Sequence, residues 1–585
     1  MTSRTLPVLF DGRGRVVLTA TGVAVVALFL QTLSFPFLNW DDQDVFVRNT
    51  ALHSPGLFRW AFTTTYIEHY QPLAWLAWGA VDRTWTLTSG AAHAMNAGLH
   101  AACAVLVCVL AHRLTGNLGV SVLAALLFAM HPLRVEVVAW ASAMPYALAL
   151  LFALLSTLAF FNAGDRGSLL ALSIVLFAMS LLARPIAIGL PVVLYALAAL
   201  RRPRQRAAIM DSGTRRAAPS GPPSATGVFA LWVSIALAVA AAYVESGARS
   251  GGTMRDVSAG ARLTLALTAP FRYLWRTIAP FGLTPVDPLA LAPRANVTEI
   301  VAAGAALAAI SWAAWRWRRQ RPSIAIAWLS YLLLLLPAAG FLPSGLQATA
   351  DRYSYLPSIP LSIAIATAGG AILARAPRSL VQPLRIAAAI VIAALAWMSY
   401  RQTRDWRDSL TLWTRAVELN PENDIALYNL ASALADQGRR DEALARYEEV
   451  LKLVPGQADA LKNRNLLLAA RIEDDGNRLA ASGDLGSAIG AYRRAIGLDP
   501  ARTHAQAALG IALVQSGHTD EALAPLREAV KLGSSEPAVP NALAFVLMNE
   551  GRTREACDVL EAARARFPDD VNVVRNLRQL ECGSP

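Results

Sequence analysis

Long apolar runs dominate the first 400 residues of this 585-residue chain and constrain its fold most strongly. Lipid cannot hydrogen-bond an open backbone, and a helix needs about 20 apolar residues to cross a bilayer. With 55% hydrophobic and 16% charged residues, the sequence predicts an all-α, polytopic membrane bundle of about 11 spans. The predicted spans are 16–38, 92–112, 117–132, 138–162, 168–183, 185–200, 226–246, 297–315, 322–341, 357–375 and 383–400. Prolines and arginines interrupt the apolar segment 262–283, which we expect to be re-entrant or interfacial.

The distribution of basic residues predicts an orientation. Of 53 basic and 41 acidic residues, 30 basic and 14 acidic precede Arg401. The positive charge therefore belongs to membrane loops, and no nucleic-acid partner is predicted. By the positive-inside rule, the basic clusters are expected in the cytoplasm; they are the N-terminus, 201–216, 316–321 and 375–378. This orientation makes 39–91 the first outer loop and 201–225 a flexible cytoplasmic linker, and it places the C-terminal part outside.

The C-terminal part, residues 401–585, contains an internal repeat. Four glycines are each followed five residues later by an alanine, at intervals of 45, 34 and 34 residues. A 34-residue period of paired helices is typical of tetratricopeptide repeats (TPRs), in which glycine ends the first helix and alanine allows a close crossing. The pairs are Gly438/Ala443, Gly483/Ala488, Gly517/Ala522 and Gly551/Ala556, with prolines closing the units at Pro421, Pro455, Pro500 and Pro568. We therefore expect a TPR α-solenoid after a membrane domain of residues 1–400.

Two adjacent carboxylates, Asp41 and Asp42, directly follow the first predicted span. Charge at a membrane boundary is costly, and carboxylates oppose the dipole of a helix C-terminus, so a solvated helix end explains them poorly. They are candidates for a general base that accepts the proton of an acceptor hydroxyl, or for metal ligands. Glu68, further along the first outer loop, is a candidate contact in the same cavity.

Four more residues on the predicted outer side extend this candidate site. His131 and Glu136 lie at a junction of two spans. A helix cap explains Glu136 as well as a catalytic or metal role does, and a histidine like His131 more often has a structural role. Arg184 and Arg352 stand against the cytoplasmic bias of arginine, and each suits a phosphate. The alternatives are snorkelling for Arg184 and an ion pair with Asp351 for Arg352.

Taken in order, these motifs resemble the family of transmembrane, TPR-containing glycosyltransferases, which is similar to the protein O-mannosyltransferases with the GT-C fold. The motifs that carry the resemblance are Asp41-Asp42, His93…Asn96…His100, His131-Pro132…Glu136…Trp140, Arg184-Pro185…Leu190-Pro191, Asp351-Arg352-Tyr353-Ser354-Tyr355-Leu356-Pro357-Ser358 and the TPRs. The resemblance implies an inverting transfer of a sugar from a polyprenyl-phosphate donor to a hydroxyl, in the inner membrane. The acceptor would be Ser or Thr of a periplasmic protein, bound by a periplasmic TPR domain.

The resemblance also implies roles for single residues. Asp41 or Asp42 would be the base and Arg352 the ligand of the donor phosphate, while Arg184 stands where relatives usually show lysine. Residues 143–146 depart from the family, because relatives often carry charged residues there. A divalent metal ion is left open, since outer acids can hold one but arginine alone can neutralise a single lipid phosphate.

Two other functions compete with this hypothesis. One is a non-catalytic, membrane-anchored TPR scaffold for envelope assembly, in which the outer acids would tolerate replacement. The other is a ligase or polymerase of lipid-linked glycans, which would share the lipid-phosphate cavity but use a sugar acceptor. Identification of the acceptor separates the protein glycosyltransferase from the ligase or polymerase of lipid-linked glycans.

Overall fold

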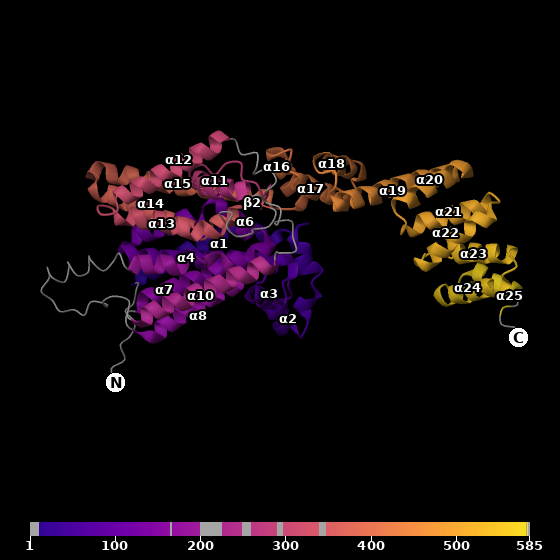
Figure 1. Ribbon diagram of the computed structural model, residues 1–585, viewed down its shortest axis with the longest axis horizontal. Coiled ribbons are helices and arrows are strands. Elements are labelled where there is room, and N and C mark those ends of the chain that lie inside the picture. The colour runs from indigo at the N-terminus through magenta and orange to yellow at the C-terminus, as the bar shows by residue number, and fades with distance from the viewer. Residues whose placement is uncertain are drawn as a thin grey trace. The chain divides into compact units, whose positions relative to one another are not determined.

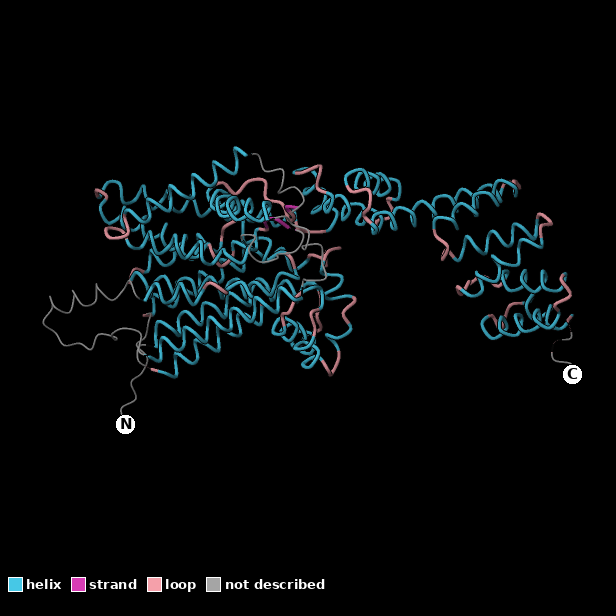
Figure 2. Tube along the Cα trace, viewed as in Figure 1, coloured by secondary structure: helices cyan, strands magenta, loops and turns pink. Residues whose placement is uncertain are grey.

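The computed structural model describes residues 11–163, 166–198, 225–248, 259–288, 297–338, 347–580 and 582. The predicted linker 201–225 lies outside the described residues except for Ala225. The chain divides into two compact units, Met1–Asn429 and Leu430–Pro585. Almost all of the regular structure in both units is helical (Figure 2). The all-α prediction is confirmed, apart from one two-stranded ribbon.

The first unit is a bundle of apolar helices, many of which run side by side (Figure 1). Each predicted span that lies within the described residues coincides with helical structure. The helices are α1 (Gly12–Phe29) with η1 (Leu30–Ser34), α4 (Ser89–Thr115), α5 (Leu118–Ala129), α7 (Met144–Ala163), α8 (Gly167–Ala183), α10 (Ala225–Ala248), α12 (Val297–Arg316), α13 (Pro322–Leu335), α14 (Ser358–Arg375) and α15 (Arg378–Asp405). Residues 190–198 are also helical.

Six helical segments within the described residues are long and apolar enough to cross a membrane, and a bent pair around residues 130–131 makes a seventh candidate. Several other apolar helices are shorter, such as α8 and α13. The protein is therefore a multi-pass membrane protein, while the predicted number of about 11 spans remains a prediction. The interrupted segment 262–283 falls mostly in α11 (Ala259–Ile278), which contains Pro270 and is not among the candidate spans.

Short elements between the long helices carry the candidate site. They are η2 (Gln43–Val47), η3 (Thr50–His53), α2 (Leu57–Thr63), η4 (Tyr66–Glu68), α3 (Pro72–Trp85), η5 (Pro132–Arg134), α6 (Val135–Ala139), η6 (Ala141–Ala143), η7 (Pro185–Ala187) and η11 (Asp351–Ser354). Residues 39–91 pack with parts of α4, α7 and α8 in one apolar cluster, in which Trp75 and Trp78 are fully buried. Strands β1 (Asp287–Pro288) and β2 (Gln347–Thr349) pair antiparallel. The chain before η11 is thereby tied to the segment that follows α11.

The last helices of the first unit are α16 (Ser409–Leu419) and the beginning of α17 (Asp424–Asp436), which crosses the division between the units. The structural division at residue 429 therefore lies later than the predicted domain boundary at residue 400. The second unit continues with α18 (Arg440–Leu453), α19 (Ala458–Ala481), α20 (Leu485–Leu498), α21 (Thr503–Gln515), α22 (Thr519–Lys531), α23 (Ala538–Asn549), α24 (Thr553–Arg566) and α25 (Val571–Gln579).

These helices form TPR pairs, and the repeat glycines lie where the pattern predicts. The glycines at 438, 483, 517 and 551 each end a first helix with φ between +75° and +86°, a left-handed conformation that glycine adopts without strain. The alanines five residues later are fully buried. The longer first interval is absorbed by α19, which has 24 residues where α21 has 13. Eleven extra residues make about three full turns, so the residues after the insertion lie on the same side of the helix as they would without it.

Candidate active site

A buried ion pair joins two motifs that are far apart in the sequence. Arg352 on η11 pairs through its guanidinium with the Glu136 carboxylate on α6, and the Arg352 backbone N donates to Glu136 Oε2 at 2.8 Å. Arg352 is 7% exposed and Glu136 is 2% exposed. Burial makes such a pair sensitive to loss of either partner, because the remaining charge is left uncompensated. Arg352 therefore pairs with Glu136 rather than with its neighbour Asp351.

Tyr146 connects this arginine to the second one. The Tyr146 hydroxyl accepts from Arg352 Nε at 3.2 Å and from Arg184 Nη2 at 3.3 Å. Its ring lies 5.0 Å from the Arg184 guanidinium and 5.8 Å from that of Arg352. Arg184 also donates to Gln71 Oε1 at 2.8 Å and lies 2.9 Å from His69 Nε2. One phenol thus holds two buried guanidinium groups, of which Arg352 is paired with Glu136.

Aromatic rings surround the guanidinium of Arg352. Besides Tyr146, its central carbon lies 5.0 Å from the ring of Tyr353, 5.2 Å from that of Trp140 and 6.0 Å from that of Trp40. Trp40 and Trp140 stack at 4.2 Å. The rings exclude water and keep the planar guanidinium group in one orientation. A lysine ammonium group could not stack on these rings equally well.

The two adjacent aspartates have different environments. Asp42 is fully buried, and its carboxylate accepts from the Leu38 N–H at 3.0 Å and from both the N–H (3.0 Å) and the hydroxyl of Ser142. Asp41 is partly exposed, and no residue in the described part of the chain donates a hydrogen bond to its carboxylate. Asp42 therefore fixes the loop to η6, whereas the Asp41 carboxylate has lone pairs that no described residue uses.

Burial raises the pKa of both aspartates. The pKa of Asp41 rises to about 6 mainly because burial disfavours its charged form, which Arg352 and Arg184 partly offset. The pKa of Asp42 also rises to about 6 by burial, although the hydrogen bonds from Ser142 and Leu38 act in the opposite direction. A carboxylate with a raised pKa beside two cations is typical of a functional site.

A second charge network supports η11 from the other side. Arg276 on α11 lies 3.4 Å from Asp351 and 3.5 Å from Asp287, and Arg272 bonds Glu299 at 2.8 Å. Asp287 also accepts from the Thr349 hydroxyl at 2.6 Å, next to the β1–β2 pairing. The contacts of Arg276 and Asp287 hold the chain on either side of the β1–β2 pairing, next to Arg352. The Arg272–Glu299 pair is more exposed and makes no bond to η11 among the described residues.

The remaining predicted site residues have more peripheral places. Both ring nitrogens of His131 are used, Nδ1 by the Leu133 N–H at 3.2 Å and Nε2 by the Thr277 carbonyl oxygen at 3.0 Å. Glu68 is exposed, in a turn with φ of +60° next to His69. Their roles as substrate or metal contacts stay predictions. Among the described residues, no three His, Cys, Asp or Glu side chains are grouped to hold a metal ion.

Sequence reasoning assigned to several residues of this site no contact with the arginines. Tyr146, which belongs to the segment that departs from the family, bridges the two arginines. Gln71 and His69 orient Arg184, and Trp40 and Trp140 border Arg352. The local signals were the place of His69 beside Glu68, that of Trp140 in the motif of Glu136 and that of Trp40 beside the aspartates. The hydrogen bonds of Tyr146 join segments separated by 38 and 206 residues.

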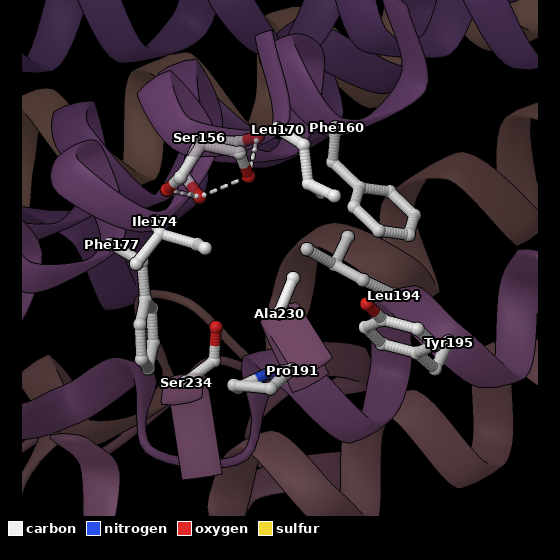
Figure 3. A pocket seen from close by; sticks show the side chains of 11 residues that line it. Ser156, Phe160, Leu170, Ile174, Phe177, Pro191, Leu194, Tyr195, Ala230 and Ser234 are labelled. Carbon is white, nitrogen blue, oxygen red and sulfur yellow. Dashed lines mark hydrogen bonds between the residues drawn. The ribbon is translucent and has the colours of Figure 1, made fainter. Parts of the chain in front are cut away.

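The bundle also contains a small cavity away from these charges. It lies between α7, α8, α10 and residues 190–198, and Figure 3 shows Ser156, Phe177, Tyr195 and Ser234 around it. Its volume is about 20 Å³, which is the room of about one water molecule. Ser156 and Ser173 bond each other's backbone carbonyl oxygens at 2.7 and 2.9 Å. These serine hydrogen bonds join α7 to α8. None of the predicted site residues lines the cavity.

Comparisons with known proteins agree with the repeats. The tetratricopeptide-repeat family model matches residues 398–469 and 474–537. A protein O-mannosyl-transferase of Drosophila melanogaster, Tmtc2, is 32% identical over 132 residues, which are 22% of this chain and 14% of that protein. TMTC1 of Mus musculus is 30% identical over 118 residues, 20% of this chain and 12% of that protein.

Two further matches concern other proteins. The poly-β-1,6-N-acetyl-D-glucosamine export protein of Escherichia coli K12 is 33% identical over 94 residues, 16% of this chain and 11% of that protein. The crystal structure of the TPR protein YrrB is 18% identical and covers 33% of this chain and 91% of that chain, with a TM-score of 0.19. The matched segments thus span less than a sixth of the length of the curated relatives. The chain is a TPR-containing multi-pass membrane protein that is homologous, over part of its length, to the TMTC protein O-mannosyl-transferases.

Proposed function

We propose that this protein is an integral-membrane glycosyltransferase. It transfers a sugar from a polyprenyl-phosphate donor to a hydroxyl acceptor, a Ser or Thr of a periplasmic protein that the TPR domain binds. The observation that carries the proposal is the partly exposed Asp41 carboxylate, which accepts no hydrogen bond from the described residues and lies in the field of two buried arginines that share Tyr146. The names of the TMTC relatives support a transferase activity.

The proposed reaction is one displacement with inversion at the anomeric carbon. Asp41 accepts the proton of the acceptor hydroxyl, whose oxygen forms a bond to the anomeric carbon of the sugar. The bond from that carbon to the phosphate oxygen breaks, and its electron pair leaves with the polyprenyl phosphate. Arg352 and Arg184 stabilise the negative charge that grows on the phosphate, and burial strengthens this effect.

The connectivity of the helices supports an outer location of this site. From η11, α14 leads to Arg375 and Arg378, and α13 starts from the basic run 316–321. The 18 residues of α14 span about 27 Å, close to the thickness of a bilayer core. The basic loops therefore lie about one membrane thickness from Arg352. If they are cytoplasmic, as the positive-inside rule requires, the site is periplasmic.

The disulfide between Cys557 on α24 and Cys582 after α25 supports a periplasmic TPR domain, because disulfides persist in oxidising compartments. We expect both thiols to be inaccessible to a maleimide reagent in intact cells until a reductant is added. Replacing both cysteines by serine should lower the unfolding free energy of the TPR domain by about 3 kcal/mol, given a loop of 25 residues. Free thiols at these positions in untreated cells would contradict the predicted side.

The raised pKa of Asp41 predicts the pH dependence of transfer. A base acts only when ionised, so the rate should rise as the pH increases through about 6. A solvated aspartate would be ionised already above about pH 4. Initial rates at saturating donor, measured in proteoliposomes across this range, test the expectation. A rate that is constant between about pH 5 and pH 8 would exclude Asp41 with its raised pKa as the base.

The function itself is tested with the purified full chain in proteoliposomes. Polyprenyl-phosphate mannose with a labelled sugar is supplied together with a Ser- and Thr-containing peptide, and labelled peptide is the expected product. Mass spectrometry of envelope proteins from a deletion strain identifies the natural acceptor. Labelled glycan instead of labelled protein would favour a ligase of lipid-linked glycans. If the deletion phenotype is rescued by an Asp41→Asn variant that transfers no sugar, the protein is a scaffold.

A further inference from the structure

Helix α16 is half of a TPR whose two signature positions are altered. In α18, the repeat places Ala443 and Tyr447, and in α20 it places Ala488 and Tyr492. Counting back one period of 34 residues from α18 leads to Ser409 and Trp413 on α16. α16 thus carries a hydroxyl in place of the small alanine and an indole in place of the phenol. Both replacements introduce a hydrogen-bonding group.

The signature phenols of α18 and α20 bond the preceding helix of the TPR array, and Tyr447 also accepts from Asn463 on α19 at 3.3 Å. The Tyr447 and Ser432 hydroxyls are 2.9 Å apart, and the Tyr492 hydroxyl donates to Asn477 Oδ1 at 2.8 Å. Ser432 and Asn477 each lie fifteen residues before their tyrosine, on the preceding helix. The indole of Trp413 instead donates its Nε1–H to Asn39 Oδ1 at 2.7 Å. Helix α16 therefore directs its signature contact at the loop of Asp41.

Asn39 is also held at its backbone N–H and at its side-chain amide nitrogen. Its backbone N–H donates to the Ser409 hydroxyl at 2.8 Å, and its side-chain amide donates to the Asn429 carbonyl oxygen at 3.0 Å. Trp413 is fully buried, and its ring packs edge-on against that of Trp40, the residue after Asn39, with 5.3 Å between the ring centroids. We call Asn39, Ser409, Trp413 and Asn429 the Asn39 clamp.

The clamp lies two residues before Asp41, and the bonds of Asp42 to Ser142 lie one residue after it. The short stretch between these two anchors has little freedom, and Trp40 within it stacks on Trp140. A general base must stay within hydrogen-bonding distance of its proton, and small displacements reduce the rate strongly. Among the described residues the clamp makes no hydrogen bond to Arg184 or Arg352, and Glu136 and Tyr146 hold Arg352 independently of it, so donor binding should not depend on the clamp.

We propose that the Asn39 clamp positions Asp41 for proton transfer, so that the first TPR helix, α16, is part of the catalytic unit. Asn39 and Trp413 are positioning residues in this proposal, which rests on the proposed function. Helix α16 and Asn429 are then connected by hydrogen bonds to Asn39, two residues before the base, in addition to any role of the TPR array in binding the acceptor.

The test compares Trp413→Phe with Tyr492→Phe in the full chain. Trp413→Phe keeps an aromatic ring but removes the donor to Asn39, and Tyr492→Phe removes the corresponding bond of a later repeat. We expect Trp413→Phe to lower kcat by about 10- to 100-fold with the KM for the lipid donor unchanged. Asn39→Ala should act in the same way. Tyr492→Phe should leave kcat unchanged.

The pH profile provides a second readout that a purely structural role would not move. A loosened loop admits water to Asp41, so the acidic limb of the rate should shift below about pH 6 in Trp413→Phe. The charges that face Asp41, from Arg352, Arg184, Asp44 and Asp42, are the same in this variant. If Trp413→Phe and Asn39→Ala match Tyr492→Phe in kcat and pH profile while Asp41→Asn is inactive, the clamp is refuted and the function stands. Absence of transfer by the unaltered protein would refute the function itself.

Discussion

Asp41→Asn should abolish sugar transfer while the protein inserts and folds normally. Asparagine has nearly the same size as aspartate but cannot accept the proton of the acceptor hydroxyl. Loss of a general base lowers rates by about 10²- to 10⁴-fold. Folding should be unaffected, because the Asp41 carboxylate accepts no hydrogen bond from the described residues. The measurement is the initial rate of transfer in proteoliposomes, at protein amounts matched by size-exclusion chromatography.

Asp42→Asn is the matched control, because it makes the same chemical change one residue later. An asparagine there would place an amide NH2 against the N–H of Leu38 or the donors of Ser142. Unsatisfied buried donors of this kind cost about 1–3 kcal/mol. We therefore expect a lower melting temperature and a smaller folded yield, with transfer retained by the protein that folds. The reverse pattern, with Asp41→Asn active and Asp42→Asn inactive but stable, would assign the base to Asp42.

Local patterns in the sequence predicted most of the architecture. Apolar runs must become helices in lipid, and the observed helices follow the predicted spans in the described residues. The TPR glycines need a left-handed conformation at each turn, and the structure has it at all four positions. The repeat spacing showed that the first interval has eleven extra residues, but it did not show that these residues lengthen α19.

The roles within the site depend on contacts that no local pattern encodes. Asp41 and Asp42 are equivalent in the sequence, and they differ because Ser142, a hundred residues away, bonds only Asp42. Trp413 shares its aromatic character with Tyr447 and Tyr492 at the same repeat position, and its partner Asn39 lies 374 residues earlier. Such pairings are set by how the helices pack, so one sequence indicates the candidates but does not assign their roles.

The buried pair of Glu136 and Arg352 should control both stability and activity. Glu136→Ala leaves the Arg352 guanidinium buried without its carboxylate and removes the acceptor of the Arg352 backbone N–H. Breaking a buried pair costs about 3–5 kcal/mol. Transfer should fall as well, because Arg352 loses the partner that holds it beside Tyr146. Thermal unfolding in detergent and the transfer rate measure the two effects.

Glu299→Ala is the matched control for that loss, because Glu299 also pairs with an arginine, Arg272, at 2.8 Å but is 42% exposed. Exposed pairs contribute only about 0–1 kcal/mol, so this variant should remain stable and active. A double-mutant cycle of Glu136→Gln and Arg352→Gln should give a coupling energy of about 1–3 kcal/mol. Glu136→Gln leaves the buried charge of Arg352 without a partner, and Arg352→Gln removes that charge. Equal effects of Glu136→Ala and Glu299→Ala, together with a coupling energy near zero, would mean that the pair is not buried in the working protein, and the phosphate site built around Arg352 would then have to be abandoned.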